Sequence, residues 1–165
     1  MKSVVILQNI EKNTNLGQLI RTCNALGVAE VCVLGRKKYA SFGNQRTHSS
    51  TAIRHFFDYP SAYAFYKKQG YRLVAVEISP RSESVNRVQF GDDTAFVMGN
   101  EGQGVPQAAL ALCDAHVHIP QYGAGASLNV NVACGIVLNA FMASAPRTPN
   151  PIVQHKFIAA SGEAE

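Results

Sequence analysis

The chain has 165 residues, of which 47% are hydrophobic and 16% are charged, and its formal net charge is +4. This length and balance predict one folded domain that buries roughly 70% of its unfolded surface, and they exclude an intrinsically disordered chain. The N-terminus runs directly into the strand-like segment Val4–Leu7, and no long apolar run follows. We therefore expect neither a signal peptide nor a membrane-spanning helix, and predict a cytoplasmic protein.

Strand-like and helix-like segments alternate along the chain. In order, the sequence predicts strand Ser3–Leu7, helix Leu16–Leu26, strand Glu30–Leu34, helix Ser61–Gln69, strands Arg72–Glu77 and Thr94–Met98, short helix Pro106–Leu112, strand Val117–Ile119 and helix Leu128–Ala143. Ser61 and Ser127 are the expected N-caps, and Gly27 and Gly70 are the expected helix stops. This alternation predicts an α/β fold with a mostly parallel sheet and helices on both faces.

The last part of the chain has a different composition. Pro146, Pro149 and Pro151 follow the closing helix and are expected to end regular structure. We therefore predict a single domain over residues 1–145 and a loose, flexible tail over residues 146–165.

The cysteines stand far apart inside apolar segments, with no Cys-x-x-Cys pair; they are Cys23, Cys32, Cys113 and Cys134. This pattern predicts buried free thiols in a reducing compartment. A zinc site needs clustered Cys and His residues, and the sequence has no such cluster, so we expect no metal.

The segment from Val31 to Phe57 holds no Asp or Glu, but it is rich in basic residues interleaved with Tyr39 and Phe42. Lysine and arginine neutralise phosphates, and aromatic rings stack on bases, so the segment fits a nucleic-acid track. A solvated basic loop explains the pattern equally well. The candidate RNA-binding residues are Arg36, Lys37, Lys38, Arg46 and Arg54.

Three polar loops follow predicted strands, at Gln8–Asn15, Gly99–Gly104 and Gln121–Ser127. Because the carboxyl ends of parallel strands meet at one edge of a sheet, these loops are expected to share one ligand crevice. The sequence GNEGQG of the second loop is neither a dinucleotide-binding fingerprint nor a P-loop, although its glycines permit a close approach of backbone to ligand. The sequence thus predicts a small-molecule site.

Several polar side chains at these loops have both a structural and a functional interpretation. Asn15 is a good helix cap, and Arg21 is either an ordinary surface residue or a phosphate ligand. Asn129 and Asn131 flank Val130 in an otherwise apolar run, and buried amides must find partners. On this basis, Asn129 is the stronger candidate for a site residue.

Three segments of the sequence also resemble a known family. The segments are NTNLGQLIRT (Asn13–Thr22), FVMGNEGQGVP (Phe96–Pro106) and IPQYGAGASLNVNVA (Ile119–Ala133). In this order they resemble the three motifs of the SpoU-type RNA ribose 2′-O-methyltransferases of the SPOUT superfamily, the α/β-knot methyltransferases. The resemblance implies a C-terminal trefoil knot, S-adenosylmethionine as methyl donor, tRNA or rRNA as substrate, and a homodimer whose interface completes the active site.

The resemblance also assigns residues. It implies a catalytic set of Asn15, Arg21, Glu101, Ser127 and Asn129. It implies a donor-binding set of Val76, Gly99, Asn100, Gly102, Ile119, Gln121, Ser127 and Leu128. One departure from the family pattern is Asn131, where many relatives carry serine, and it is expected to adjust packing or a hydrogen bond.

The implied reaction is an in-line attack of a ribose 2′-hydroxyl on the sulfonium methyl group. Arginine stays protonated at neutral pH because its pKa is above about 12, so it is a poor base. We therefore expect Arg21 to hold the 3′-phosphate and to stabilise the developing alkoxide. Three alternatives stay open: a knotted methyltransferase acting on an RNA base, a catalytically silent RNA-binding member, and an α/β protein that binds another nucleotide.

Overall fold

Seven parallel strands form one sheet in the computed structural model, which describes residues 1–8, 13–35, 52–125, 127–144, 148–153 and 156–157. The strand order is β3-β2-β1-β6-β4-β7-β5. The strands are β1 (Ser3–Leu7), β2 (Glu30–Leu34), β3 (Ala52–Phe56), β4 (Arg72–Val76), β5 (Glu83–Ser84), β6 (Thr94–Met98) and β7 (Ala115–His118). The predicted α/β class and parallel sheet are confirmed.

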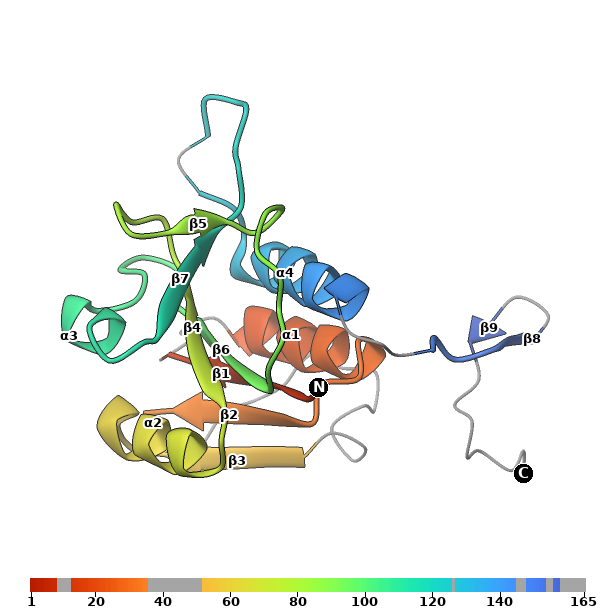
Figure 1. Ribbon diagram of the computed structural model, residues 1–165, viewed down its shortest axis with the longest axis horizontal. Helices are drawn as coiled ribbons and strands as arrows, with labels where there is room; N and C mark the ends of the chain where they lie inside the picture. The colour runs from red at the N-terminus through yellow and green to blue at the C-terminus, as the bar shows by residue number, and fades with distance from the viewer. Residues whose placement is uncertain (9–12, 36–51, 126, 145–147, 154–155, 158–165) are drawn as a thin grey trace.

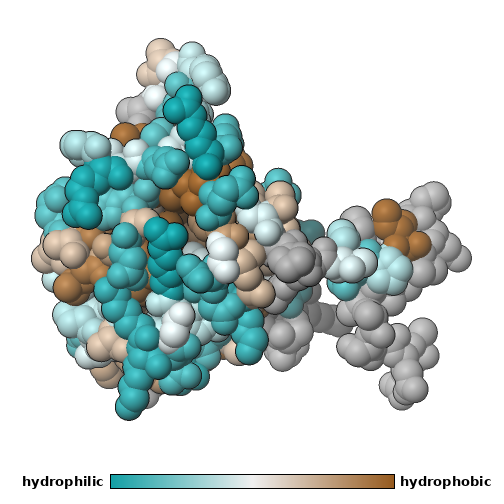
Figure 2. All heavy atoms as spheres, in the orientation of Figure 1, coloured by the Kyte–Doolittle hydropathy of each residue, from teal (hydrophilic) through white to brown (hydrophobic). Residues whose placement is uncertain are grey.

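Helices cover both faces of this sheet (Figure 1). Helices α1 (Asn13–Ala25) and α4 (Val130–Ser144) lie together on one face, while α2 (Tyr59–Lys68) and α3 (Gln107–Leu110) lie on the other. The surface seen in Figure 2 is mainly hydrophilic, with small separate hydrophobic areas. No helix in the described ranges is long and apolar enough to cross a membrane.

Each face of the sheet has its own hydrophobic core. On the α1/α4 face, Phe90, Phe96 and Phe141 contact one another with ring centroids 5.5–5.6 Å apart. On the α2/α3 face, Tyr63 and Tyr66 are fully buried among aliphatic side chains of the central strands. Alternate residues of each buried strand face the two cores, which explains why these strands read as continuous apolar runs.

The four cysteines are free and buried, as predicted. Burial raises the pKa of Cys32 to about 12 and that of Cys113 to about 11. A hydrogen bond with Cys134, together with burial, raises the pKa of Cys23. At neutral pH these three thiols are therefore protonated, and they contribute to the core as small apolar groups.

The structure corrects several predicted boundaries. Strands β3 and β5 were not predicted; β3 falls inside the segment interpreted as a basic loop. Helix α2 is capped by Asp58 rather than Ser61: the Asp58 carboxylate accepts a hydrogen bond from the Ser61 backbone N–H at 2.8 Å. That hydrogen bond lowers the pKa of Asp58. The prediction that Gly27 and Gly70 end their helices is supported by their positive φ values of 65° and 84°.

Regular structure also continues beyond Pro146, contrary to the prediction for the tail. Residues Ile152–Val153 (β8) and Lys156–Phe157 (β9) pair as a short antiparallel ribbon, which stands away from the main sheet in Figure 1. The prediction of a flexible tail otherwise falls largely on residues outside the described ranges.

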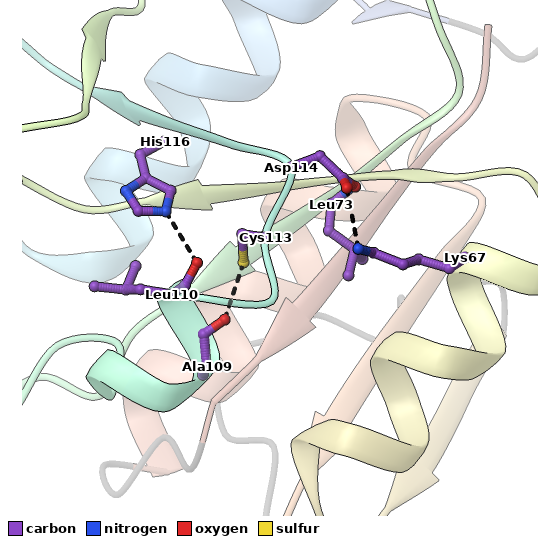
Figure 3. Close-up of polar contacts among 7 residues, drawn as sticks. All are labelled: Lys67, Leu73, Ala109, Leu110, Cys113, Asp114 and His116. Carbon is purple, nitrogen blue, oxygen red and sulfur yellow. Dashed lines mark hydrogen bonds and ion pairs between the residues drawn. The ribbon is translucent and has the colours of Figure 1, made fainter.

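The connection from α3 into β7 is fixed by polar contacts (Figure 3). Asp114 accepts a hydrogen bond from the Leu73 backbone N–H at 2.8 Å and forms an ion pair with Lys67 at 3.0 Å. The buried His116 ring lies 3.0 Å from the Leu110 carbonyl oxygen through Nε2. These contacts fix the start of β7, at the amino end of the sheet.

Candidate functional site

A cavity of about 370 Å³ opens at the carboxyl ends of β4, β6 and β7. This volume lies within the range of about 300–1,000 Å³ that small-molecule sites occupy. Its walls combine the apolar side chains of Val76, Met98 and Ile119 with the backbone of the glycine loop. We call this cavity the crevice.

All eight residues of the predicted donor-binding set line the crevice: Val76, Gly99, Asn100, Gly102, Ile119, Gln121, Ser127 and Leu128. The second and third polar loops therefore meet, as the sequence predicted from the geometry of parallel strands. Asn15 of the first loop and Asn129 do not line the crevice; the buried side chain of Asn15 reaches it through a hydrogen bond to Glu101, which does.

Glycines are required where the glycine loop folds back on itself. Asn100 and Gly104 exchange backbone hydrogen bonds of 3.0 and 2.9 Å. A Cβ on Gly99 would lie 2.5 Å from the Gly104 carbonyl carbon and 2.7 Å from the Val105 nitrogen. Gly104 has a φ of +66°, and a Cβ there would collide with the Glu77 carboxylate. Side chains at either position would displace the wall of the crevice.

Three predicted catalytic residues form one hydrogen-bonded chain. Asn15 donates through Nδ2 to Glu101 Oε1 at 2.8 Å, and Asn129 donates through Nδ2 to Asn15 Oδ1 at 3.2 Å. The three residues lie 86 and 114 positions apart along the chain, one in each family-like segment. Asn15 thus uses its amide to tie two loops together; since α1 begins at Asn13, it is not the helix cap.

Asn129, and not Ser127, caps the closing helix. Its Oδ1 accepts a hydrogen bond from the Asn131 backbone N–H at 2.9 Å, and α4 begins at the next residue, Val130. Ser127 is exposed and lines the crevice. Asn131 accepts a hydrogen bond from the Thr22 hydroxyl at 2.8 Å, which joins α4 to α1. The departure at Asn131 therefore supports the packing of these two helices.

Arg21 is not among the residues that line the crevice. It is exposed on α1, six residues beyond Asn15, which is about 9 Å along a helix axis. Six residues also turn the side chain about 120° away from that of Asn15. Within one chain, the structure does not bring Arg21 to the other predicted catalytic residues.

Of the predicted RNA-binding residues, Arg36, Lys37, Lys38 and Arg46 lie outside the described residues. Arg54 is on β3, where its guanidinium donates to Glu30 at 2.9 Å and lies 4.7 Å from the centroid of the Phe65 ring. The hydrogen bond to Glu30 raises the pKa of Arg54. Arg54 thus has partners within the fold, and its role toward RNA stays a prediction.

Sequence reasoning missed Glu77 and His118, polar residues of the crevice that lie outside the three predicted loops, and did not single out Gln103 within the second loop. Glu77 accepts hydrogen bonds from the backbone N–H of Val105 at 2.9 Å and of Ile78 at 3.1 Å. Glu77 directly follows an apolar strand and precedes Ser79-Pro80. This position could have indicated a fourth polar loop at the same edge of the sheet. His118 ends β7, where a histidine in a strand usually indicates nothing beyond packing.

Comparison with known proteins agrees with this geometry. Residues 2–139 match the SpoU rRNA Methylase family. The chain belongs to this family. It is 32% identical over 137 residues to a tRNA (guanosine(18)-2′-O)-methyltransferase of Thermus thermophilus, covering 81% of this chain and 71% of that protein. It is 30% identical over 137 residues to the Escherichia coli K12 protein of the same description, covering 60% of its length.

Solved structures of SpoU-type enzymes share the fold. The A. aeolicus TrmH/SpoU tRNA modifying enzyme superposes with a TM-score of 0.80 at 30% identity, covering 87% of this chain and 75% of that one. An AdoMet-bound rRNA methyltransferase from Sinorhizobium meliloti has a TM-score of 0.75 at 23% identity, covering 86% of this chain and 56% of that one. The predicted membership of the SpoU-type family is therefore confirmed.

The crevice suits S-adenosylmethionine on its own features. The glycine loop packs so tightly on itself that neither Gly99 nor Gly104 has room for a Cβ, and it therefore lines the cavity largely with backbone. Apolar walls suit the faces of an adenine ring, and backbone groups at strand ends suit its edge. Among the described residues, no group of three or more His, Cys, Asp or Glu side chains gathers to hold a metal ion.

Proposed function

We propose that this SpoU-family enzyme uses the crevice to bind S-adenosylmethionine and transfers its methyl group to a ribose 2′-hydroxyl of tRNA or rRNA. The observation that carries the proposal is the chain Glu101–Asn15–Asn129, which joins the three family segments at the edge of a cavity built for a small molecule. Its similarity to tRNA 2′-O-methyltransferases supports the same reaction.

The donor supplies an electrophilic methyl group on a sulfonium sulfur, and the thioether that remains is a good leaving group. The chain's own residues therefore mainly bind the two reactants and align them. The backbone of Gly99–Gly104 and the walls at Val76, Ile119 and Leu128, which line the crevice, would hold the donor. Orientation of the reacting groups can supply roughly 7–11 kcal/mol in the best cases. Asn15 and Asn129 keep Glu101 in place, so that the wall facing the substrate does not move.

Arg21 is proposed to hold the RNA phosphate beside the reacting ribose. Its fork of five N–H donors suits two phosphate oxygens, whereas its high pKa makes it a poor base. Arg21 and the crevice are separate within one chain, so this role requires a second copy of the chain or an RNA strand that spans both places. The basic residues Arg36, Lys37, Lys38 and Arg46 are proposed to extend the RNA track.

A homodimer is proposed for the same reason. Val132 and Ile136 of α4 are 49% and 38% exposed, and their spacing of four residues puts them on one side of the helix. Leu128, which is 40% exposed, lies just before the cap of this helix and lines the crevice. A stripe of this kind next to the crevice is suited to burial against a second copy. Such a contact would place the α1 and α4 surfaces of two chains near each other and complete the site.

A trefoil knot is also proposed. The connection between β4 and β6 runs outward past β7, pairs there as β5, and returns to the centre of the sheet. Strand β7 therefore has this connection on its outer side and β4 on its inner side, before the chain continues into α4. This arrangement supports a knot formed by the last part of the domain. We further propose that the enzyme works in the cytoplasm.

The decisive test is methyl transfer from labelled S-adenosylmethionine to bulk unmodified tRNA and rRNA, followed by alkaline hydrolysis. A 2′-O-methyl group blocks attack on the neighbouring phosphate, so the label is expected in alkali-resistant dinucleotides. Label released in mononucleotides would show base methylation instead. A protein that binds the donor and RNA but transfers nothing would be the silent member.

The role of Arg21 is tested by Arg21→Lys, which keeps the charge and removes the planar fork. The variant is expected to bind S-adenosylmethionine like the wild type in calorimetry, and to lose most of its turnover. Arg72→Lys, an exposed arginine at the amino end of β4, is the matched control and should leave both unchanged. Turnover near that of the wild type in Arg21→Lys would contradict a two-pronged phosphate contact.

A further inference from the structure

A second cavity, of about 520 Å³, lies beside the crevice at the β5 edge of the sheet. Its lining mixes polar and apolar surface: Ser82, Glu83 and Ser84 at β5, Asn86 and Arg87 of the following turn, His118 of β7, and Pro120 and Tyr122 of the loop that leads to α4. The one acidic side chain, Glu83, and the one basic side chain, Arg87, are both exposed. No part of the crevice function described above uses this cavity, which we call the edge cavity.

The frame of the edge cavity is hydrogen-bonded. The Val85 backbone N–H donates to the His118 carbonyl at 2.9 Å, which docks β5 on the end of β7. The Arg87 backbone N–H donates to the Ser84 carbonyl at 2.9 Å and closes the turn that carries Asn86 and Arg87. These polar side chains are therefore presented by a fixed backbone, which is what a binding site requires.

His118 lines both cavities, so the edge cavity borders the place where methyl transfer is proposed. Its Nδ1 lies 2.9 Å from the Ser82 hydroxyl, which donates its single hydrogen to the Ser79 carbonyl at 2.7 Å. When the Ser82 hydroxyl gives its single hydrogen to Ser79, Nδ1–H of His118 is the donor to Ser82. In the neutral ring, Nε2 is left as a hydrogen-bond acceptor, fixed by this contact.

Tyr122 and Arg87 supply the features of a nucleotide site. Tyr122 is 94% exposed, so its ring faces are available for stacking. A single exposed aromatic side chain is ordinary on a protein surface; this one lines a cavity that also contains serine, asparagine, arginine and histidine side chains, and it directly follows Gln121 of the crevice. Arg87 is exposed and forms no ion pair with any residue in the described part of the chain.

We propose that the edge cavity holds one unpaired nucleotide of the RNA substrate, with its base stacked on Tyr122 and its phosphate bound by Arg87. Proteins recognise unpaired RNA by aromatic stacking combined with hydrogen bonds to base edges and phosphates. Asn86, Ser84 and His118 Nε2 supply donors and acceptors for a base edge. The proposal rests on the proposed function, since it takes RNA as the substrate.

The absence of tryptophan from the sequence allows a direct test. Tyr122→Trp introduces a single tryptophan whose fluorescence is expected to be quenched when bulk unmodified tRNA is added, because a stacked base quenches an indole. Leu112→Trp is the matched control: Leu112 is 42% exposed and lies before the amino end of β7, far along the strand from the edge cavity. Its emission is expected to stay unchanged.

Binding affinities give a second readout. Tyr122→Ala is expected to weaken tRNA binding roughly 5- to 150-fold, as loss of one stacked base does, and Tyr122→Phe to leave it near the wild-type value. Arg87→Gln should make the plot of log binding constant against log salt concentration less steep by about 0.7, the contribution of one single-strand phosphate contact. Arg72→Gln should leave this slope unchanged.

The results separate this proposal from the proposed function. Calorimetry with S-adenosylmethionine and the transfer assay test the function in the wild type, whereas tRNA binding is measured without the donor. Equal tRNA affinity in Tyr122→Ala and wild type, or equal quenching in Tyr122→Trp and Leu112→Trp, would overturn the edge cavity as a nucleotide site. Loss of donor binding in Tyr122→Ala would overturn it too, because it would show that Tyr122 acts on the crevice.

Discussion

The two ends of the sheet use the same chemistry with opposite results. At the amino end, Asp93 accepts a hydrogen bond from the Lys2 backbone N–H at 2.6 Å, and Asp114 accepts one from the Leu73 N–H at 2.8 Å. At the carboxyl end, the carboxylates of Glu77 and Glu101 also accept N–H groups, but they do so around the crevice. The amino-end carboxylates hold neighbouring strands together, whereas those at the carboxyl end hold loops that form the wall of the crevice.

This difference has a physical reason. The amino-end carboxylates bind backbone groups next to the strands themselves, so the two connected segments are held in contact. Glu101 instead binds the side chain of Asn15, which in turn binds Asn129. Glu77 accepts backbone N–H groups, but those of Val105 and Ile78, which belong to the loops after the strands. The carboxylates at this end therefore hold loops that border the crevice. Stability and binding are thus carried by different ends of the same strands.

Glycine substitutions are expected to have the largest effects on stability and donor binding, and these effects should differ between the two ends of the sheet. Gly99→Ala forces a Cβ against the backbone of Gly104 and Val105, so we expect a loss of about 3 kcal/mol in the free energy of unfolding and loss of donor binding. Gly70→Ala, at the amino end, has φ +84° but free space, and should cost about 1–2 kcal/mol with donor binding intact. Denaturant unfolding and calorimetry measure both; normal donor affinity in Gly99→Ala would contradict the tight cradle.

Removal of one carboxylate from each end compares their contributions to stability and to the rate of methyl transfer. Asp114→Ala leaves the Leu73 N–H without its acceptor and is expected to cost about 2 kcal/mol, with unchanged methyl transfer. Glu101→Ala is expected to cost about 1 kcal/mol but to lower the transfer rate by a factor on the order of 10². Equal effects of the two variants on both stability and rate would show that the ends do not divide these tasks.

The smallest effect is expected at the helix caps. Asp58 caps α2 with a carboxylate whose pKa is lowered below its ordinary value of 3.8, whereas Asn129 caps α4 with a neutral amide. Because the folded pKa is the lower one, the stabilisation by Asp58 is present above the unfolded pKa and is lost as the pH falls through the folded pKa. Asp58→Asn should therefore make the free energy of unfolding depend less on pH in acid; identical pH profiles would exclude this contribution.

The sequence predicted the buried strands well because continuous apolar runs such as those of β1 and β6 have few alternatives. It did not predict β3 and β5, which lie at the two edges of the sheet. β3 carries Arg54 and His55 and is only partly buried, and β5 has two residues, so neither shows a strand pattern. Their pairing depends on neighbours far along the chain.

The site was predictable to the extent that chain order determines geometry. Loops after parallel strands had to meet, and the two amides in an apolar run indicated Asn129. The role of Asn15 as a link could not be seen, because its partners are 86 and 114 residues away. Glu77, His118 and Tyr122 were missed as site-lining residues, since a single polar or aromatic residue after a strand has no specific pattern. The roles assigned to the catalytic set came from the family resemblance alone.

The position of β1 in the sheet has a consequence for how the protein is made. Its N-terminal strand is central and pairs with β2 on one side and with β6, residues 94–98, on the other. During synthesis, about 90 residues must leave the ribosome before β6 can pair with β1. Strand β7, which pairs with β4, emerges later still. Non-local parallel pairing of this kind folds slowly and exposes apolar edges meanwhile. The nascent chain is therefore expected to depend on chaperones until β7 has emerged.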